Sequence, residues 1–489
     1  MPDENDAKRP AARKPENEAP DASPAAVGWH FSRAFWTANG VELLERAAWY
    51  GVFVAITLYL TRILGFSDME TGVIAGVFSA GLYLLPMFSG AIADKIGFKK
   101  ALLLAFALLS VGYASMWLLP TLLEGAGLAT YGKNANVLAL QETAYRWLFV
   151  PVMFIVMVGG SFIKSVITGT VAKETNEANR ARGYAIFYAL VNVGAFGGKT
   201  VVKPLRMSFG DRGLVVLNLF AMSMTALAFF LVALFYKNTA RDEPAKTLGE
   251  IGHALTKVLK EGRLVVLMVI ITGFWMVQQQ LYATMPKYVL RMAGEGASPS
   301  WYANINPFVV VLFVGVITQV MRRFSALTSM TFGMFIMPFS AFAMAAGNLL
   351  PADQPIFGMH PVAFMMVIGI AFQGLAECFI SPRYLEYFSL QAPKGEEGLY
   401  LGFSHLHSFL ASIVGFSLSG VLLDVYCPAR AKFATDAAWE ASKAHAHYIW
   451  FVFVGIAVVS ALALIIFGYL TREDPSPWGS GGKGGGADR

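Results

Sequence analysis

The chain has 489 residues, of which 56% are hydrophobic and only 14% are charged, and its formal net charge is +6. A soluble domain carries about a quarter charged residues, so this composition excludes an ordinary soluble protein. The basic residues are spread over the loops between apolar segments. That distribution argues against a nucleic-acid-binding protein, which gathers its positive charge on one face.

Twelve apolar segments are each long enough to cross the ~30 Å hydrocarbon core of a bilayer. Their apolar runs are continuous rather than alternating, which predicts helices and argues against a β-barrel. Because backbone groups in lipid must be satisfied within each segment, we expect an all-α integral membrane protein. The predicted spans are residues 34–60, 71–93, 99–119, 146–171, 184–206, 213–236, 263–290, 302–321, 327–348, 361–390, 398–422 and 447–470.

The spans divide the chain into two halves. We expect an N-terminal six-helix bundle over residues 29–236 and a C-terminal six-helix bundle over 263–472. The cytoplasmic linker between them, 237–262, contains an amphipathic stretch that predicts a short surface helix. Two six-helix bundles with a site between them are typical of the major facilitator fold. The terminal segments 1–28 and 473–489 are rich in Pro, Ala or Gly and predict disordered tails.

The loop residues indicate the orientation in the membrane. Most basic loop residues, including Lys95, Lys173 and Arg263, lie on the same side as the N-terminus, whereas the loop with Lys203 and Arg206 is an exception. The positive-inside rule therefore predicts that both termini are cytoplasmic. No signal-peptide pattern precedes the first span. We expect the bacterial inner membrane as the location.

The junction of the second and third spans carries a recognisable motif. It consists of Gly90, Asp94, Gly97, Lys99 and Lys100 in the pattern G-x-x-x-D-x-x-G-x-K-K. This pattern resembles the cytoplasmic loop motif of major facilitator transporters. The glycines permit a tight turn and close helix approach, and we expect Asp94 to cap the next helix or to pair with a cation. A basic loop with turn glycines is the alternative interpretation.

Three ionisable residues, Glu42, Glu45 and Arg46, lie inside the first apolar span. A charged side chain at bilayer depth costs roughly 2.5–3.5 kcal/mol on insertion scales. Spacings of three and four residues place Glu45 and Arg46 beside Glu42 on one helical face. That face is expected to line a water-filled pathway. A buried ion-pair network that only fixes helix register is the alternative.

Further polar residues occur within other spans. Two prolines, Pro307 and Pro382, are expected to kink their helices and to free backbone carbonyls. Glycines one turn before the lysine of the fourth span allow a helix or a ligand to approach it. The polar residues are Lys164 in the fourth span, Asn192 in the fifth, Asn306 in the eighth, and Glu377 and Ser381 in the tenth.

These motifs together resemble the proton-coupled oligopeptide transporter family of the major facilitator superfamily. The matching patterns are E-x-x-E-R at 42–46, G-x-x-x-x-K ending at Lys164, Phe-Tyr-x-x-x-Asn-x-Gly at 187–194, and Glu-x-x-x-Ser-Pro at 377–382. They occur in order over about residues 35–420 and in the expected spans. The resemblance implies a proton symporter for di- and tripeptides.

The resemblance also implies a role for each matching residue. Arg46 and Lys164 are expected to bind the carboxylate of the peptide, and Glu377 its amino terminus. Glu42 and Glu45, together with Lys164, are expected to carry the coupling proton. The other expected contacts to the solute are Trp49, Tyr50, Tyr83, Asn192, Gln279, Asn306 and Ser381. Cations in one half and a carboxylate in the other suit a zwitterion.

The sequence departs from the family pattern at several positions. Gln279 stands where the family commonly has an acid, and Phe53 stands where that acid has its arginine partner. Because both partners are absent together, no charge is stranded, and we expect the salt bridge that closes the outer side in the family to be missing. Ser404 and Ala47 replace a usual tryptophan and phenylalanine.

Two further groups of residues have alternative interpretations. Lys199 and Lys203, one turn apart, are interpreted as lysines that snorkel to the interface, with an anion-attracting vestibule as the alternative. His405 and His407 titrate near neutral pH when unperturbed. Because they are two residues apart, we expect at most one to face the cavity, and a packing histidine is the favoured interpretation.

We therefore expect a monomeric, proton-coupled symporter of di- and tripeptides or peptide-like solutes that works by alternating access. The alternatives are the same fold with a non-peptide cargo, such as an anion, amino acid or metabolite, and a solute receptor that does not transport. No cofactor is expected besides the proton gradient, and no metal, because His445 and His447 lack further ligands. An enzyme is not expected, since no nucleotide-binding loop or nucleophile–base pair is apparent.

Overall fold

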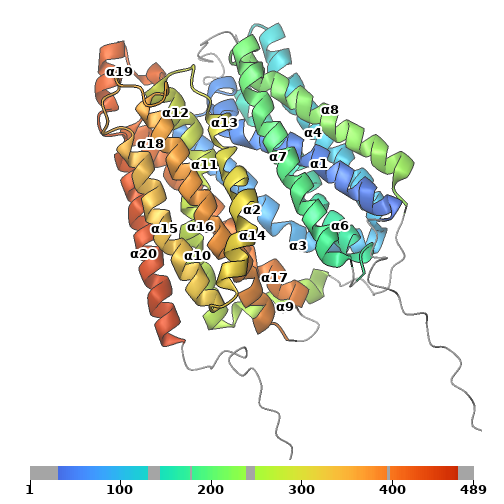
Figure 1. Ribbon diagram of the computed structural model, residues 1–489. Coiled ribbons are helices and arrows are strands. Elements are labelled where there is room, and N and C mark those ends of the chain that lie inside the picture. The colour runs from blue at the N-terminus through green and yellow to red at the C-terminus, as the bar shows by residue number, and fades with distance from the viewer. Residues whose placement is uncertain (1–30, 130–143, 177–178, 238–247, 394–396, 472–489) are drawn as a thin grey trace, which may run out of the picture.

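The computed structural model describes residues 31–129, 144–176, 179–237, 248–393 and 397–471, and these ranges fold almost entirely into helices (Figure 1). Eleven of the described helices are long and apolar enough to cross a membrane, and a further span is formed by α2 and α3, which meet at an angle of 46°. The fold is therefore all-α and agrees with the twelve predicted spans. Both predicted tails lie outside the described residues.

The first bundle contains the helices up to residue 235, drawn in blue to green in Figure 1. Its elements are α1 (Arg33–Leu58), η2 (Tyr59–Ile63), α2 (Asp68–Leu84), α3 (Pro86–Ile96), α4 (Phe98–Gly125), η3 (Ala144–Leu148), α6 (Phe149–Lys173), α7 (Arg180–Phe209) and α8 (Arg212–Phe235). A helix, α9 (Leu248–Leu259), is present where the linker was predicted to form one.

The second bundle contains the helices from residue 262 onward, drawn in yellow-green to red. Its elements are α10 (Gly262–Gln278), α11 (Gln280–Ala283), α12 (Met285–Ala293), α13 (Pro299–Tyr302), α14 (Ile305–Met321), α15 (Ala326–Ala346), α16 (Pro361–Gln391), α17 (Glu397–Ser404), α18 (Leu406–Tyr426), η4 (Arg430–Lys432), α19 (Asp436–Ser442) and α20 (Tyr448–Leu470).

Several helices are broken where the sequence predicted continuity. The seventh predicted span is divided at Gln279 and Thr284 into α10, α11 and α12. The interruption expected at Pro307 is present, because the span is broken between α13 and α14 just before this proline. The carbonyl of Ala303, four residues earlier, accepts a hydrogen bond from Lys199 instead. Pro382 lies inside α16 as predicted.

Close backbone contact joins α1 to α7 within the first bundle. A Cβ atom added at Gly198 would lie 2.1 Å from the carbonyl oxygen of Ala47, and one added at Gly194 would lie 2.5 Å from that of Leu43. Small residues at such interfaces let membrane helices pack backbone to backbone. The polar segment of α1 is therefore held directly against α7.

The two bundles meet along α2 and α18. Gly72 and Gly76 of α2 lie against the carbonyls of Phe416 and Ser412 of α18. A hydrogen bond of 2.9 Å between the hydroxyls of Ser79 and Ser412 also crosses this interface. These contacts make α2 and α18 a continuous seam between the bundles.

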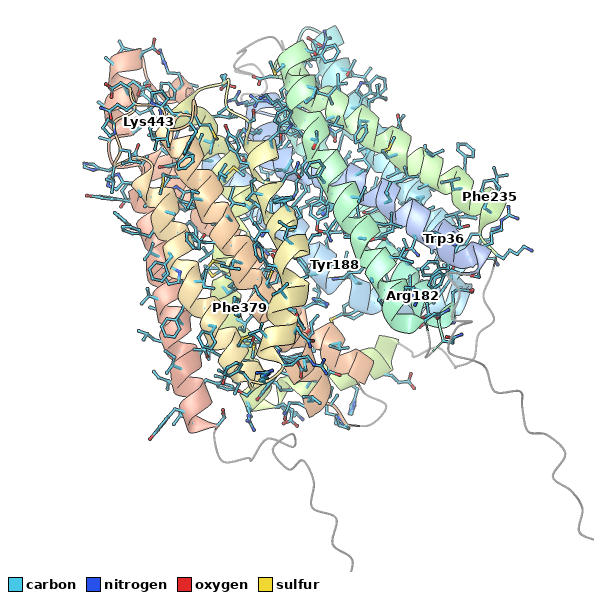
Figure 2. The ribbon with its side chains drawn as sticks, in the orientation of Figure 1. Trp36, Arg182, Tyr188, Phe235, Phe379 and Lys443 are labelled. Carbon is cyan, nitrogen blue, oxygen red and sulfur yellow. The ribbon has the colours of Figure 1, made fainter. Side chains whose placement is uncertain are left out.

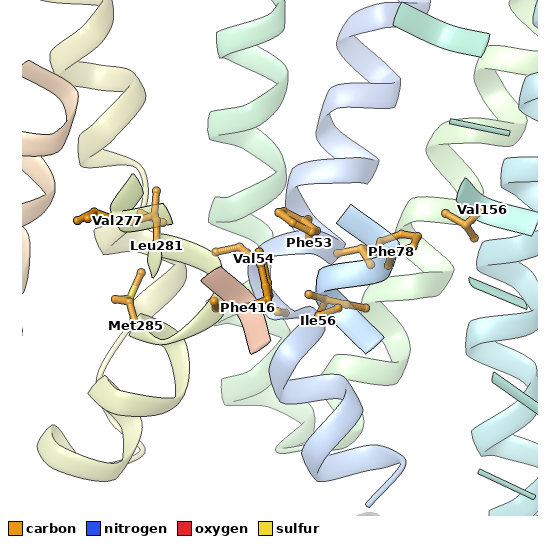
Figure 3. Close-up of a cluster of buried hydrophobic side chains, with 14 of the residues drawn as sticks. Phe53, Val54, Ile56, Phe78, Val156, Val277, Leu281, Met285 and Phe416 are labelled. Atoms are coloured by element: carbon orange, nitrogen blue, oxygen red, sulfur yellow. The ribbon is translucent and has the colours of Figure 1, made fainter. Parts of the chain in front are cut away.

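A cluster of buried apolar side chains fills the centre of the contact between the bundles (Figure 3). Phe53 of α1 and Phe78 of α2 come from the first bundle, and Leu281 of α11 and Phe416 of α18 from the second. The rings of Phe53 and Phe416 are 6.0 Å apart between centroids. Apolar side chains of α1, α2, α11 and α18 therefore join the two bundles here.

We name the two ends of the molecule by one residue each. The Arg62 end is where η2 is followed by α2, and the Asp94 end is where α3 is followed by α4. At the Arg62 end, α12 and α13 of the second bundle contact α1 and α7 of the first. Tyr188 of α7, labelled in Figure 2, is exposed, and so is Lys164 of α6. At the Arg62 end the two bundles are therefore in direct contact, beside a hollow of about 620 Å³ that Arg62, Asp68 and Lys287 help to line.

Candidate functional site

The ionisable residues of α1 form one ion-pair cluster. The Arg46 Nε atom lies 3.2 Å from Glu42 Oε1 and 2.5 Å from Glu45 Oε2, and an Arg46 terminal nitrogen also pairs with Glu45. Both glutamates are buried. The predicted proximity of the three residues on one face of the helix is therefore present. Because two carboxylates surround Arg46, its charge is already compensated before any solute binds.

Lys164 completes this cluster from α6. It interacts electrostatically with Glu42 and Arg46 and with His405 of the second bundle, and its side chain is exposed. With Lys164 included, the cluster contains two cations and two carboxylates. The fourth-span lysine and the first-span acids thus converge as the sequence predicted, and Lys164 is the accessible member.

On the opposite side, α16 contributes Glu377. Its Oε2 atom accepts hydrogen bonds of 2.8 Å from Gln278 Nε2 and 3.2 Å from Asn306 Nδ2. Asn306 therefore contacts the carboxylate of Glu377 as well as being a predicted solute ligand. Among the described residues, no lysine or arginine forms an ion pair with Glu377.

The glutamine that contacts this carboxylate is not the one singled out from the sequence. Gln278 bonds to Glu377, whereas the Gln279 amide donates 3.0 Å to the hydroxyl of Ser412 in α18. The two neighbouring side chains leave α10 in directions about 100° apart, as expected for one helical step. The sequence contained both residues, but the family pattern drew attention to only one of them.

Tyrosines lie between the charged groups of the two bundles. The Tyr50 ring centroid is 6.0 Å from Arg46 Cζ. Tyr83 interacts electrostatically with Tyr50, Arg46 and Glu377, which places it in the same region. Tyr282 belongs to the same group and was not predicted. The sequence does not indicate this position, because Tyr282 reaches the group through the packing of α11 against α1.

The remaining predicted ligands are placed as follows. Trp49 stacks on Phe53 with ring centroids 4.6 Å apart. Asn192 donates 2.8 Å to the carbonyl of Tyr188, one turn earlier in α7. The Ser381 hydroxyl oxygen is buried and has no hydrogen-bond partner among the described residues. Tyr188 interacts electrostatically with Glu377 and Tyr50, so this part of α7 faces the second bundle.

The interpretation of Lys199 as a snorkelling residue is wrong. Lys199 is only 2% exposed, and its Nζ atom lies 5.0 Å from the Tyr50 ring centroid and 5.7 Å from that of Tyr282. Its one hydrogen bond, to the carbonyl of Ala303, is 3.3 Å long. Lys203 differs, because its Nζ atom lies 4.3 Å from the ring of Trp301.

The two histidines of the eleventh span have different surroundings. His407 is buried, packs on Trp275 and Tyr384 with ring centroids 5.2 and 4.9 Å apart, and bonds through Nδ1 to the Ser404 carbonyl. His405 is half-buried, and both histidines interact electrostatically with Lys164 of the first bundle. His407 is therefore the packing histidine, and His405 is the more accessible of the two.

The loop motif at the Asp94 end is present, although its aspartate makes neither expected contact. Gly97 has a φ of +90° and separates α3 from α4, and a Cβ at Gly90 would meet Ser165 at 3.4 Å. Lys99 donates 3.0 Å to the carbonyl of Ala233. Within the described ranges, Asp94 is exposed, caps no helix and forms no ion pair.

At the Arg62 end, a buried ion-pair cluster joins the bundles. The carboxylate of Asp68 in α2 lies 2.7 Å from Lys287 Nζ and 2.9 Å from Arg291 Nη1, both in α12. Arg291 also donates 2.5 Å to the carbonyl of Cys427. The family's salt bridge is absent at Phe53 and Gln279, as expected, and these other residues form ion pairs between the bundles instead.

A second ion-pair cluster lies beside the first. Glu295 of the second bundle pairs with Arg62 at 2.5 Å and with Arg206 at 2.7 Å, and Arg62 also pairs with Asp211 at 3.2 Å. Burial opposes ionisation of Glu295, but the two arginines outweigh it and hold the pKa of Glu295 below its usual value. The exceptional basic loop noted in the sequence thus has an acidic partner in the other bundle.

Comparison with known proteins agrees with this architecture. The sequence model of the Major Facilitator Superfamily matches residues 40–352. The chain belongs to this superfamily. It is therefore an integral membrane protein of a transporter fold and not an enzyme.

The similar proteins are transporters as well. Dipeptide and tripeptide permease A of Serratia proteamaculans is 22% identical over 438 residues, which cover 80% of this chain and 83% of the permease. Multidrug resistance protein MdtH of Photorhabdus laumondii is 23% identical over 387 residues, covering 78% and 85%. The predicted resemblance to oligopeptide transporters is thus confirmed at the level of sequence similarity.

Solved structures show the same fold. A POT family transporter in complex with 5-aminolevulinic acid superposes with a TM-score of 0.69 at 17% identity, covering 91% of this chain and 98% of that one. The POT family transporter PepTSo superposes with a TM-score of 0.67 at 16% identity, covering 91% and 99%.

Proposed function

We propose that this protein is a proton-coupled symporter that moves di- and tripeptides or peptide-like solutes across the membrane by alternating access. The observation that carries this proposal is the pairing of unlike charges across the two bundles. Lys164 and Lys199 belong to the first bundle, and Glu377, without a cationic partner, belongs to the second. A zwitterion between them would compensate both sides and would draw the bundles together.

The ion pairs between the bundles at the Arg62 end support alternating access in this proposal. Because most basic loops lie at the Asp94 end, the positive-inside rule assigns that end to the cytoplasm, together with both termini. The Arg62 end would then face outwards, where the ion pairs of Asp68 and Glu295 hold the bundles together. Opening the Arg62 end would require those pairs to separate.

Proton coupling rests on the cluster of Glu42, Glu45, Arg46 and Lys164. Two buried carboxylates share one arginine, and burial favours the protonated form of a carboxyl group whereas a nearby cation favours the charged form. If Lys164 moves towards a solute carboxylate, the acids lose part of that compensation and take up a proton. Solute and proton would then cross together, without a cofactor and within one monomer.

A related cargo is the second candidate. Phe53 and Gln279 remove an ion pair that the oligopeptide transporter family commonly has, and one similar transporter was solved with 5-aminolevulinic acid, a zwitterion without a peptide bond. A small amino-acid-like metabolite is therefore the favoured alternative to a peptide. Either solute carries an amine and a carboxylate.

Uptake into liposomes tests the proposal. Purified protein is reconstituted, an inward proton gradient is imposed, and accumulation of labelled dialanine or 5-aminolevulinic acid is followed, with protein-free liposomes as the control. Accumulation of dialanine that a protonophore abolishes supports peptide symport, and accumulation of 5-aminolevulinic acid alone supports the second candidate. Binding without flux would indicate a receptor, and flux unaffected by the protonophore would contradict proton coupling.

A further inference from the structure

Lys199 is the most unusual charged residue of the described structure. It is a lysine in the middle of a membrane-spanning helix, it is 2% exposed, and among the described residues no carboxylate lies within ion-pair distance of it. Its Nζ atom contacts one carbonyl and the faces of two tyrosines. Ring faces stabilise a cation by only about 0.5–2 kcal/mol. An isolated buried charge costs several kcal/mol, so this lysine lacks most of its compensation.

The ammonium group of Lys199 lies near Phe53, the residue of α1 that stands where the oligopeptide transporter family has an arginine. Phe53, which occupies that place, lies 4.9 Å from the Tyr282 ring between centroids, and Lys199 Nζ lies 5.7 Å from the same ring. The two residues therefore reach one tyrosine from different helices. The positive charge absent from α1 is supplied at this site by α7.

The arginine of α1 is already compensated. Arg46 pairs with both Glu42 and Glu45, and Lys164 interacts electrostatically with Glu42. Lys199 instead interacts electrostatically with Glu377 of the second bundle. Glu377 also lacks a cation within ion-pair distance among the described residues, and is held only by Gln278 and Asn306. One uncompensated cation and one uncompensated acid thus face each other across the bundles.

We propose that Lys199 binds the carboxylate of the transported zwitterion, while Glu377 binds its amine. This assignment deepens the proposed function and rests on it. It makes Lys199, rather than Arg46, the residue that discriminates solutes with a free carboxylate from solutes whose carboxylate is amidated or esterified. The ammonium leaves the carbonyl of Ala303 and the ring of Tyr50 when the solute enters.

Comparing dialanine with dialanine amide tests the assignment directly. Loss of a charge-assisted hydrogen bond lowers affinity by about tenfold or more. The wild type in nanodiscs is therefore expected to bind dialanine about tenfold or more tightly than its amide. In Lys199→Gln the ratio of the affinity for dialanine to that for its amide falls to about one, because the affinity for dialanine drops and that for the amide does not. Lys199→Arg is expected to retain the preference.

Matched variants separate this effect from general damage. Lys203→Gln removes a lysine one turn away whose Nζ atom lies 4.3 Å from the Trp301 ring centroid, and it should keep the preference of the wild type. Lys164→Gln tests the competing assignment, because the proposed function has Lys164 move towards the solute carboxylate. Retention of the preference in Lys199→Gln, or its loss in Lys164→Gln alone, overturns the assignment of Lys199. A thermal melt of each variant checks that the protein is folded, and Lys199→Arg serves as the test if Lys199→Gln does not fold.

The outcome is distinguishable from failure of the proposed function. The same comparison is made with 5-aminolevulinic acid and its methyl ester, which carry no peptide bond. If dialanine accumulates in liposomes but Lys199→Gln still discriminates, the function stands and the assignment is wrong. If only 5-aminolevulinic acid is discriminated through Lys199, the peptide cargo is wrong and the assignment stands. If neither zwitterion binds, both are wrong.

Discussion

Asp68 of α2 and Lys287 of α12 form an ion pair of 2.7 Å between the two bundles, and both side chains are almost fully buried. Arg291 binds the second carboxylate oxygen of the same aspartate. A buried acid shared by two cations joins the bundles strongly, but only as long as all three are present. Removing any one of these three charges is therefore expected to weaken the contact between the bundles at the Arg62 end.

Removing the shared acid should open or destabilise this end. Asp68→Asn leaves Lys287 and Arg291 buried without a carboxylate, and breaking a buried pair in this way costs about 3–5 kcal/mol. We expect a clearly lower melting temperature. Asp436→Asn is the matched control, since it breaks the more exposed pair with Arg430, and such pairs contribute about 0–1 kcal/mol. Equal melting temperatures for the two variants would contradict the structural role of Asp68.

Closure of the Arg62 end should weaken at low pH through Glu295. Because its pKa in the closed structure is below the usual value, its contribution is fully present above the ordinary carboxyl pKa. That contribution is lost as the pH falls through the lowered value. Spin labels at Met207→Cys and Gly296→Cys, both exposed positions, should report longer distances at low pH.

The variant Glu295→Gln isolates this effect. It should show the longer distances already at neutral pH and little further change on acidification. Asp211 remains in this variant. Because burial raises the pKa of Asp211, its protonation at low pH favours the closed structure, which is opposite to the effect of Glu295. If Glu295→Gln opens further on acidification as much as the wild type does, the pH dependence has another source.

Glu45→Gln should uncouple transport from protons. A gradient of one pH unit is worth about 1.36 kcal/mol per proton, which supports about tenfold accumulation for one coupled proton. Without an ionisable group at this position, accumulation should fall to about the equilibrium level, while exchange of internal for external solute continues. Glu440→Gln, in α19 outside the spans, is the control. Undiminished accumulation by Glu45→Gln would refute the role of this acid.

Gln278 should matter for solute affinity more than its neighbour does. Its amide holds the Glu377 carboxylate at 2.8 Å, and a hydrogen bond to a charged group contributes about 1.5–3 kcal/mol. Gln278→Ala is therefore expected to weaken dialanine binding about tenfold or more in a calorimetric titration. Gln279→Ala removes a bond to Ser412 instead, and should lower stability more than affinity. The reverse order would show that Gln279 is the ligand, as the family pattern suggested.

Gly198 should tolerate no side chain. An added Cβ would lie 2.1 Å from the Ala47 carbonyl oxygen, so Gly198→Ala must push α1 and α7 apart, at a cost of about 1–3 kcal/mol. Gly197→Ala is the matched control, because a Cβ there has no neighbour within 4 Å, and alanine is the better helix former. The melting temperature should fall in Gly198→Ala and rise slightly in Gly197→Ala. An unchanged melting temperature in Gly198→Ala would show that the two helices are not in such close contact.

Several site residues could be recognised in the sequence because charged side chains are rare inside membrane-spanning segments. Glu42, Glu45, Arg46, Lys164 and Glu377 are ionisable groups inside apolar spans, and this contradiction is visible without any coordinates. Lys199 was equally visible but was interpreted wrongly, since its distance from the end of the span allowed it to reach the interface. Gln278 was overlooked because its importance comes only from Glu377, 99 residues later in the chain.

The amino-acid sequence by itself determined that this chain crosses the membrane in twelve helical spans and carries charges within them. Lipid offers no hydrogen bonds to the backbone, so long apolar runs have one stable conformation. Only the tertiary structure decided which charges compensate one another and which remain without a partner. Sequence spacing fixes neighbours within a single helix, whereas the rotation and depth of helices from distant parts of the chain fix which side chains meet between the bundles.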